Sequence, residues 1–596
     1  MLYGGCAMPR DPIQLLHDIF GFSRFRGVQD QVVRRVLDGQ HTLAIMPTGA
    51  GKSLCYQLPA VALEGTCIVI SPLIALMHDQ LRAAQAVGIR AASLTSVDAD
   101  WRETQDRLRS GTLDLLYVAP ERASGEGFRD LLRASPIALF AIDEAHCVSE
   151  WGHDFRPDYR LLRPLLDSFP DLPRLALTAT ADAHTREDIL VQLGIPRDGM
   201  IISGFDRPNI RYAVHPREGI SRQIADLMAA QPGPGIVYAQ TRSATEKLAE
   251  TLSRGGREVR AYHAGLDPKV RAGNQSAFIA SEDMVMVATV AFGMGIDKPD
   301  VRFVAHAGLP KSIEGYYQES GRAGRDGEPA QAHLFWGAED FARARQRIAE
   351  LEPARQAGER ARIAALGALV ETGGCRRAVL LRHFGEDPPP TCGNCDNCLN
   401  PPSSVDATEV ARKFLSAVYR TGQSYGVQHI ESVLTGATND KVAQRGHDRL
   451  SVFGIVDRDD VPLLRPVSRA LLIRDALSTN EHGGLELGPN ARPILRGEEV
   501  VSLILPPRRE RRRGGKAGGR DANPIGDPLF DALRECRRDL AKEAGVPPYV
   551  IFHDSTLREM AEQRPATRSA LGEITGVGAR KLDAYGEAFL AVLRQF

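Results

Sequence analysis

The chain of 596 residues is too long for a single hydrophobic core and indicates about three to five domains. With 43% hydrophobic and 25% charged residues, and no apolar run near the roughly 18 residues of a membrane span, the composition indicates a globular protein and excludes a bilayer-spanning helix. The formal net charge of −1 neither supports nor excludes a nucleic-acid partner, because a local basic stripe is enough to bind phosphates.

The N-terminal residues show no basic flank followed by an apolar stretch, so we expect no secretory signal and a cytoplasmic protein. In that reducing compartment the nine cysteines are not expected to form disulfides. The scattered cysteines are interpreted as ordinary thiols: Cys6, Cys55, Cys67, Cys147 and Cys536.

Short apolar runs alternate with helical stretches up to about residue 340, in two series. Strands that are apolar throughout are typical of parallel sheets covered by helices on both faces. The two series therefore predict two α/β lobes, with a boundary near residues 204–209. The predicted strands are 43–47, 67–71, 115–119, 139–143 and 174–178 in the first lobe, and 235–239, 259–263, 284–289, 301–306 and 332–336 in the second.

A glycine loop, Thr48-Gly49-Ala50-Gly51-Lys52-Ser53, follows the first predicted strand. Gly49 and Gly51 permit a backbone whose N–H groups converge on a phosphate at a helix N-terminus. In this interpretation Lys52 reaches the β- and γ-phosphates of ATP, and the Ser53 hydroxyl is a magnesium ligand.

An acidic pair, Asp143-Glu144, ends the fourth predicted strand, at the sheet edge where ligands bind. Asp143 is predicted to hold magnesium, and Glu144 to orient and polarise the attacking water. The alternative is a turn and an unrelated surface pair.

Positive charge near the γ-phosphate is predicted from the segment that carries Gln318, Arg322 and Arg325. The two arginines, three residues apart, lie on one helical face and can point across a cleft as arginine fingers. Because this segment belongs to the second lobe, hydrolysis would depend on closure of the lobes. A solvated arginine pair is the alternative.

These motifs, in this order, resemble those of the RecQ helicases of superfamily 2, and the resemblance extends over nearly the whole chain. Met46 stands where the general phosphate loop has glycine, but the loop Thr48–Ser53 fits the helicase variant of this motif. The resemblance implies an α/β fold with two RecA-like lobes, then a helical zinc-binding module, a winged-helix domain and a small all-α HRDC-like domain of the bacterial type. The implied domains are 1–205, 206–345, 346–403, 404–507 and 525–596, with a basic linker at 508–524.

The same resemblance assigns further nucleotide and DNA contacts. Phe22 would stack on adenine and Gln29 would read its edge, with Arg26 in the same segment and Asp297 near the ribose and magnesium. Contacts to DNA are implied for Ser71 and for Thr289, the latter to the backbone.

An aromatic loop follows the acidic pair directly. Its Trp151 and Phe155 can stack on unpaired bases, and Arg156 can hold phosphate. Such a loop next to Glu144 would let an occupied strand report to the water-activating residue. The alternative is that both aromatic residues belong to the core.

Four clustered cysteines, Cys375, Cys392, Cys395 and Cys398, suit a tetrahedral zinc ion in a structural site. An iron–sulfur cluster shares this chemistry and stays open. Arg376, Arg377 and Arg382, between the first and second of these cysteines, are predicted to face DNA phosphate or solvent.

The C-terminal domains add candidate DNA contacts. Lys441 and Arg445 lie in the region that resembles a recognition helix, and His482 lies at the tip of a predicted β-hairpin that would form a short wedge. In the HRDC-like domain Tyr549 can stack on single-stranded DNA, with a purely structural tyrosine as the alternative.

The combined interpretation is an ATP-dependent DNA helicase that requires Mg²⁺ and Zn²⁺ and unwinds duplex and branched DNA from 3′ to 5′ in recombination and repair, with polarity and role implied by the resemblance alone. The rivals are an RNA helicase and a DNA-binding scaffold whose ATPase controls residence time. Expected partners are single-stranded tails and forked duplexes, with a single-strand-binding protein and a topoisomerase as candidates, no membrane, and a monomeric, nucleoid-associated protein.

Overall fold

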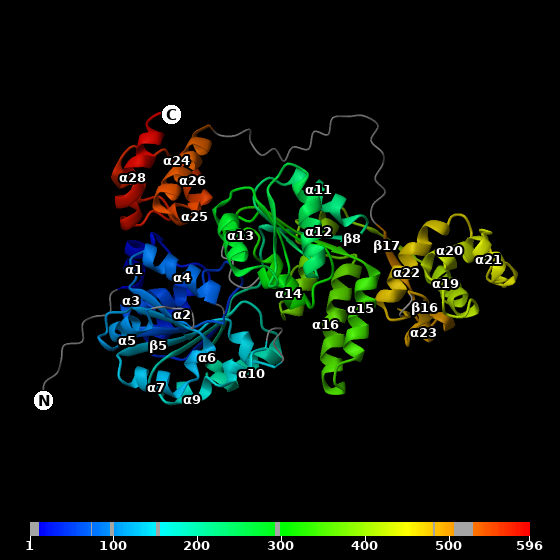
Figure 1. Cartoon of the computed structure of the whole chain (residues 1–596), viewed down its shortest axis with the longest axis horizontal. Helices are drawn as coiled ribbons and strands as arrows, with labels where there is room; N and C mark the ends of the chain where they lie inside the picture. Colours follow the sequence, from blue (N-terminus) through cyan, green and yellow to red (C-terminus); the bar gives the residue numbers. More distant parts are fainter. Residues whose placement is uncertain are drawn as a thin grey trace.

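The computed structural model describes residues 11–72, 74–95, 100–150, 155–292, 298–480, 483–505 and 528–596. The predictions for Trp151, Asp297, His482 and the basic linker lie outside the described residues. Within these described ranges, no helix has both the length and the apolar character needed to cross a bilayer. Figure 1 shows two α/β lobes side by side, a helical domain over the first lobe and a further domain at the far end.

Lobe 1 is built on a seven-stranded parallel sheet with strand order β3-β4-β2-β5-β6-β1-β7. Alternate residues of a strand enter different cores: Leu43 and Ile45 lie on one face of the sheet and Ala44 on the other. Both faces are therefore buried, which is why these strands are apolar throughout. The strands are β1 (Thr42–Ile45), β2 (Thr66–Ile70), β3 (Ala91–Leu94), β4 (Leu115–Val118), β5 (Ile137–Ile142), β6 (Arg174–Thr178) and β7 (Met200–Ile202). The helices used below are α1 (Pro12–Phe20), α2 (Gln29–Leu37), α3 (Leu54–Ala62), α4 (Ile74–Ala86) and α10 (Ala183–Leu193).

Lobe 2 repeats this plan with six parallel strands in the order β10-β11-β9-β12-β13-β8. The strands are β8 (Ile210–Pro216), β9 (Gly235–Tyr238), β10 (Val259–Tyr262), β11 (Val285–Ala288), β12 (Phe303–His306) and β13 (Ala330–Trp336). Its helices are α11 (Ile220–Ala230), α12 (Arg242–Ser253), α13 (Pro268–Ala280) and α14 (Ile313–Ser320). Residues 203–209, the interlobe segment, connect β7 of lobe 1 to β8 of lobe 2.

The helices after lobe 2 share its hydrophobic core and do not form a separate one. Ala378 and Leu380 of α17 belong to the core of lobe 2, whereas Leu381 and Phe384 at the end of α17 belong to a core of lobe 1. This helix therefore contacts both lobes. The elements are α15 (Ala338–Ala349), α16 (Pro353–Glu371), α17 (Arg376–His383) and α18 (Asp396–Leu399).

The next domain has its own core and two small antiparallel sheets, β14-β17 and β15-β16. The pair β15 and β16 confirms the predicted hairpin. Its elements are β14 (Ser403–Asp406), α19 (Thr408–Arg420), α20 (Val427–Thr435), α21 (Asp440–Gln444), α22 (Leu464–Ile473), β15 (Leu477–Thr479), β16 (Leu485–Leu487), α23 (Ala491–Arg496) and β17 (Ser502–Leu505).

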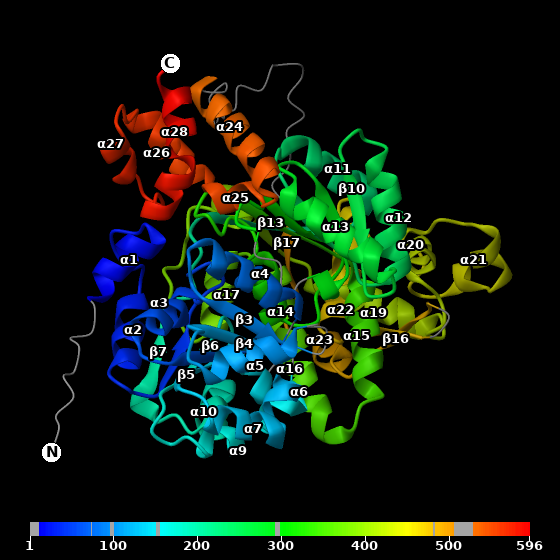
Figure 2. The same cartoon turned by 60° about the vertical axis from the view of Figure 1, so that its left-hand side comes forward.

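The C-terminal helical domain, residues 528–596, packs around a separate core and is helical as predicted. Figure 1 places it over lobe 1 and beside lobe 2. Figure 2 shows the same domain from another side. Its helices are α24 (Pro528–Ala544), α25 (Pro548–Ile551), α26 (Asp554–Gln563), α27 (Arg568–Gly572) and α28 (Ala579–Leu593).

Every strand predicted for the two lobes is present, but β3, β7 and β8 were missed. The sequence of β3, Ala91-Ala92-Ser93-Leu94, has little β-propensity, and β8 is interrupted by Arg211 and His215. The acidic pair consequently follows the fifth strand of lobe 1, not the fourth.

Candidate nucleotide site and metal centre

A cavity of about 380 Å³ lies where the lobes meet, and we call it the interlobe pocket. Lobe 1 contributes the glycine loop and the acidic pair to its wall, and lobe 2 contributes residues 318–325, which we call the arginine segment. The predicted residues brought together in its lining are Thr48, Gly49, Gly51, Lys52, Ser53, Asp143, Glu144, Gln318, Arg322 and Arg325.

The glycine loop has the backbone that an anion site at a helix N-terminus needs. Gly49 and Gly51 have φ values of 84° and 74°, which favour glycine, and α3 begins directly after Ser53. The Lys52 ammonium donates to the Met46 carbonyl at 3.3 Å and lines the pocket. Met46 itself is 1% exposed and belongs to the core, so its side chain takes no part in the pocket.

The acidic pair occupies the carboxyl edge of β5. Burial, and next the neighbouring Glu144 carboxylate, raise the pKa of Asp143 to about 7, although Lys52 opposes the shift. A divalent cation bound there would restore the ionised carboxylate, so the donor set of Asp143 and Ser53 fits a hard metal ion. Glu144 has a φ of 48°, which strains the backbone of a residue other than glycine. Strained backbone conformations of this kind cluster at functional sites.

The sequence assigned no role to His146, yet it connects Glu144, the predicted water-activating residue, to the end of β6. Its Nδ1 lies 3.3 Å from a Glu144 carboxylate oxygen and 3.0 Å from the Thr178 hydroxyl at the end of β6. The sequence signal that could have identified His146 is its position two residues after Glu144.

The loop after the acidic pair is tied to the same edge of lobe 1. Arg156 donates to the Pro72 carbonyl at 2.9 Å, and the buried Tyr159 hydroxyl donates to the Asp143 carbonyl at 2.9 Å. The Arg160 guanidinium lies 5.4 Å from the centre of the Phe155 ring. Tyr159, just after the loop, thus contacts the backbone of the acidic pair, and the coupling to an occupied strand stays a prediction.

The predicted adenine residues lie beside the glycine loop and not in the wall of the interlobe pocket. The Gln29 amide nitrogen donates to the Ala50 carbonyl at 2.9 Å, and its oxygen accepts from the Arg26 backbone at 2.8 Å. The Arg26 guanidinium lies 5.7 Å from the centre of the Phe22 ring. Adenine recognition by Phe22, Arg26 and Gln29 stays a prediction.

The predicted DNA contacts are spread over separate surfaces. Ser71 is only 2% exposed at the end of β2, so the surrounding segment must open before it can touch DNA. Thr289 follows β11, and Lys441 and Arg445 are exposed on and beside α21. These contacts stay predictions.

Tyr549 lies in an unexpected place, in the wall of the interlobe pocket with Val550, His553 and Lys581 of the C-terminal helical domain. Burial lowers the pKa of the Lys581 ammonium to about 8. No pattern in the sequence indicated that this domain closes the pocket.

The C-terminal helical domain is held by contacts to both lobes. The Gly576 N–H donates to the Gly21 carbonyl of lobe 1 at 3.0 Å, and a Cβ on Gly21 would lie 2.5 Å from the Gly578 nitrogen, so two glycines permit this approach. On lobe 2, Glu282 is the shared acceptor for three arginines of α24, namely Arg534, Arg537 and Arg538.

Reversing the charge of this acceptor, Glu282→Arg, is expected to release the C-terminal helical domain, because like charges at an interface cost several kcal/mol. The release should increase the radius of gyration in small-angle X-ray scattering and speed proteolysis within 508–524. Glu250→Arg is the matched control, since Glu250 is an exposed residue of α12 that pairs with Arg254. An unchanged radius for Glu282→Arg would show that this acceptor does not hold the domain.

The cysteine cluster has the geometry of a metal centre. All four sulfur atoms lie within 4.8 Å of one another, and the pairs Cys392–Cys398 and Cys375–Cys395 are 3.9 and 4.0 Å apart. Tetrahedral zinc with bonds of about 2.3 Å separates its sulfur ligands by about 3.8 Å, whereas a disulfide measures about 2.05 Å. The residues therefore fit a four-thiolate metal site and not a pair of disulfides.

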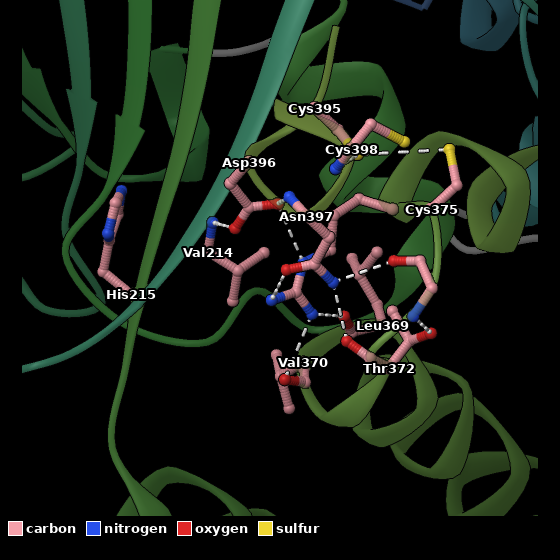
Figure 3. Close-up of polar contacts among 12 residues, drawn as sticks. Val214, His215, Leu369, Val370, Thr372, Cys375, Cys395, Asp396, Asn397 and Cys398 are labelled. Carbon is pink, nitrogen blue, oxygen red and sulfur yellow. Dashed lines mark hydrogen bonds and ion pairs between the residues drawn. The ribbon is translucent and has the colours of Figure 1, made fainter. Parts of the chain in front are cut away.

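The shell around the cysteines stabilises thiolates and fixes the loop. Each sulfur accepts one backbone N–H at 3.4 Å. Figure 3 shows the next layer, in which the Asp396 carboxylate accepts from the Val214 N–H of β8, and the Asn397 amide donates to the Thr372 carbonyl. Residues 375–398, which carry the four cysteines and which we call the metal module, are thus bonded to the sheet of lobe 2.

Of the three arginines predicted to face DNA or solvent, two contradict the prediction, whereas Arg382 is exposed. Arg376 and Arg377 are each 6% exposed. Arg376 donates to the Leu369 carbonyl at 2.6 Å, and Arg377 donates to the Ile210 carbonyl at 2.8 Å. The arginines sit in a core because their planar donors satisfy backbone carbonyls there.

Five family models match consecutive parts of the chain. They are the DEAD/DEAH box helicase (residues 26–189), the helicase conserved C-terminal domain (220–327), RecQ zinc-binding (338–399), the RQC domain (401–512) and the HRDC domain (527–593).

Relatives match the chain over nearly its whole length. The chain is 41% identical to the ATP-dependent DNA helicase RecQ of Haemophilus influenzae, over 98% of this chain and 96% of the relative. It is 43% identical to the protein of that name from Pasteurella multocida, over 98% and 93% of the two chains. The Bacillus subtilis relative is 38% identical, with 98% of both chains covered. Likeness of this extent shows that the chain belongs to the RecQ helicase family.

Proposed function

We propose that this protein is an ATP-dependent DNA helicase that moves from 3′ to 5′ along one strand and separates duplex and branched DNA in recombination and repair. The observation that carries the proposal is the interlobe pocket, whose catalytic residues come from two lobes. Neither lobe alone holds a complete ATPase site, so hydrolysis depends on their closure, and repeated closure can drive movement along a strand.

Each side chain of the pocket has a defined task. Lys52 and the N–H groups before α3 bind the phosphates, and Glu144 orients the attacking water. Arg322 and Arg325 approach from lobe 2 and stabilise the charge that develops at the γ-phosphate. Ser53 and Asp143 would hold Mg²⁺, which neutralises phosphate charge when bound.

The proposal is supported by a path from the DNA-binding loop to the water-activating residue. Arg156 bonds to the segment after β2, Tyr159 bonds to Asp143, and His146 contacts Glu144 and Thr178. A strand that moves the loop after Glu144 can thus shift the residues that orient water. The relatives named above are DNA helicases, which favours DNA over RNA as the substrate.

The test is strand displacement on DNA duplexes with a single 3′ or 5′ tail, in the presence of ATP and Mg²⁺. We expect unwinding from the 3′ tail only. DNA-stimulated ATP hydrolysis without strand separation would favour the scaffold, and unwinding of RNA duplexes but not of DNA would favour the RNA helicase.

The finer assignments belong to the same proposal. We expect a monomer associated with the nucleoid, with a single-strand-binding protein and a topoisomerase as candidate partners. The C-terminal helical domain, the exposed Lys441 on α21 and the exposed Arg445 directly after this helix would add affinity for forked DNA that falls with salt.

A further inference from the structure

One buried arginine joins the two halves of the interlobe pocket through their backbones. Arg207, in the interlobe segment, is 8% exposed. Its Nη1 donates to the Thr48 carbonyl of the glycine loop at 2.6 Å and to the Gly321 carbonyl at 2.8 Å. Its Nη2 donates to the carbonyls of Ala323 and Gly324, both at 2.9 Å.

These acceptors adjoin the proposed catalytic groups. The carbonyls of Gly321 and Ala323 flank Arg322, and Gly324 directly precedes Arg325. On the other side, the Thr48 carbonyl shares a trans peptide with the Gly49 N–H, so fixing the carbonyl also fixes the direction of that N–H. Arg207 therefore sets the orientation of peptides on both sides of the pocket without lining it.

We propose that Arg207 is a positioning residue for ATP hydrolysis, a latch that holds the arginine segment of lobe 2 in register with the glycine loop of lobe 1. The inference rests on the proposed ATPase site and adds a residue to it. Three of the four bonds go to lobe 2 and one goes to lobe 1, so Arg207 stays with the arginine segment and forms its Thr48 bond on closure.

The neighbours of Arg207 hold the arginine segment in the same way. Asn209 donates to the carbonyls of Gly324 and Glu328, both at 2.8 Å, and the Tyr317 hydroxyl donates to the Phe205 carbonyl at 2.7 Å. Gly324 has a φ of 55°, and a Cβ there would lie 2.5 Å from the Asn209 amide nitrogen. The interlobe segment and the arginine segment thus form one close-packed unit.

The metal module also contacts the interlobe segment. Arg377 donates to the carbonyls of Arg207 and Pro208, both at 3.2 Å, and pairs with Asp206 at 3.3 Å. The rings of Phe205 and Phe384 stack with centres 4.7 Å apart. A displacement of α17 therefore moves the backbone of Arg207 and, with it, the Arg207 guanidinium.

Lysine cannot replace the latch, because an ammonium is a point donor whereas the guanidinium spreads its donors over a rigid plane. We expect Arg207→Lys to lower the kcat of DNA-stimulated ATP hydrolysis by about 10- to 100-fold, the effect of a small misplacement of catalytic groups, with KM for ATP changed by less than about threefold. A fluorescent ADP analogue should still bind, since the phosphate-binding groups remain.

The matched control is Arg257→Lys. Arg257 also donates to backbone carbonyls of lobe 2, those of Met228 and Gln231, both at 2.9 Å, but it lies outside the interlobe pocket. The Arg257→Lys variant should have a lower melting temperature, as Arg207→Lys does, but the kcat of the wild type. The inference would be overturned if Arg207→Lys had the kcat of the wild type, or if Arg207→Lys and Arg257→Lys lost kcat equally.

A second variant keeps the inference testable if Arg207→Lys does not fold. Arg377→Lys leaves Arg207 intact and loosens the backbone that carries it, so a folded, metal-containing variant should lose kcat with little change in KM. Wild-type kcat in that protein would overturn the inference. A wild type that hydrolyses ATP without unwinding DNA overturns the helicase proposal alone, whereas a wild type without ATPase activity overturns both.

Discussion

Lys52→Ala is expected to reduce ATP hydrolysis by about 1000-fold and to abolish unwinding, the loss typical of a group that stabilises transition-state charge in a closed site. The Lys52 ammonium lies in the pocket with Arg322 and Arg325 from the other lobe. Alanine removes the one cation that the glycine loop itself contributes, while the N–H groups before α3 keep some affinity for phosphate. Steady-state hydrolysis with saturating single-stranded DNA measures the effect.

Lys247→Ala is the matched control, since Lys247 is an exposed residue of α12. It should hydrolyse ATP and unwind DNA like the wild type. Binding of a fluorescent tailed duplex without nucleotide should be the same in all three proteins, because Lys52 faces the interlobe pocket. Substantial hydrolysis by Lys52→Ala would place the reaction elsewhere in the chain.

Local patterns predicted the catalytic half of the site because each side chain follows a strand of known direction. The glycine loop follows β1 and the acidic pair follows β5, and strand ends of one parallel sheet meet at one edge. Arg322 and Arg325 were added because the γ-phosphate needs positive charge and their spacing predicted one helical face. Both line the pocket, but the helical face was wrong, because α14 ends at Ser320 and the two arginines lie in the turns that follow it. The strands predicted from apolar runs were correct for the same reason, since both faces of each sheet are buried.

Contacts between segments far apart in the chain could not be predicted. Nothing in the sequence around Arg207 shows that its guanidinium binds the Thr48 carbonyl, because backbone acceptors carry no sequence signal. The same holds for Lys581, which is brought to the pocket only by docking of a whole domain. Arg376 and Arg377 were assigned to the surface because arginine is rarely buried, and the structure supplies the carbonyls that reverse this preference.

Cys395→Ala is expected to remove the metal and to destabilise lobe 2 with its zinc-binding module. Cys395 and Cys375 belong to the hydrophobic core of lobe 2, and Cys395 has no exposed surface. Binding of a structural zinc contributes about 10 kcal/mol or more to folding, so loss of the metal removes a free energy as large as the whole stability of a typical domain. Wild-type protein should contain about one zinc per chain by elemental analysis, and the variant almost none, with a much lower melting temperature.

The effect should reach the ATPase site because α17 begins directly after Cys375 and carries Arg377, whose guanidinium binds the Arg207 and Pro208 carbonyls. Whatever Cys395→Ala protein stays folded should therefore lose kcat as Arg377→Lys does. Cys536→Ala, in the C-terminal helical domain, is the control and should keep both its metal and its activity. Iron in place of zinc would identify a cluster, and a folded wild type without metal would leave the four thiols as core residues. Only the metal-free result would separate the role of the module as a support for the interlobe segment from its role as a metal site.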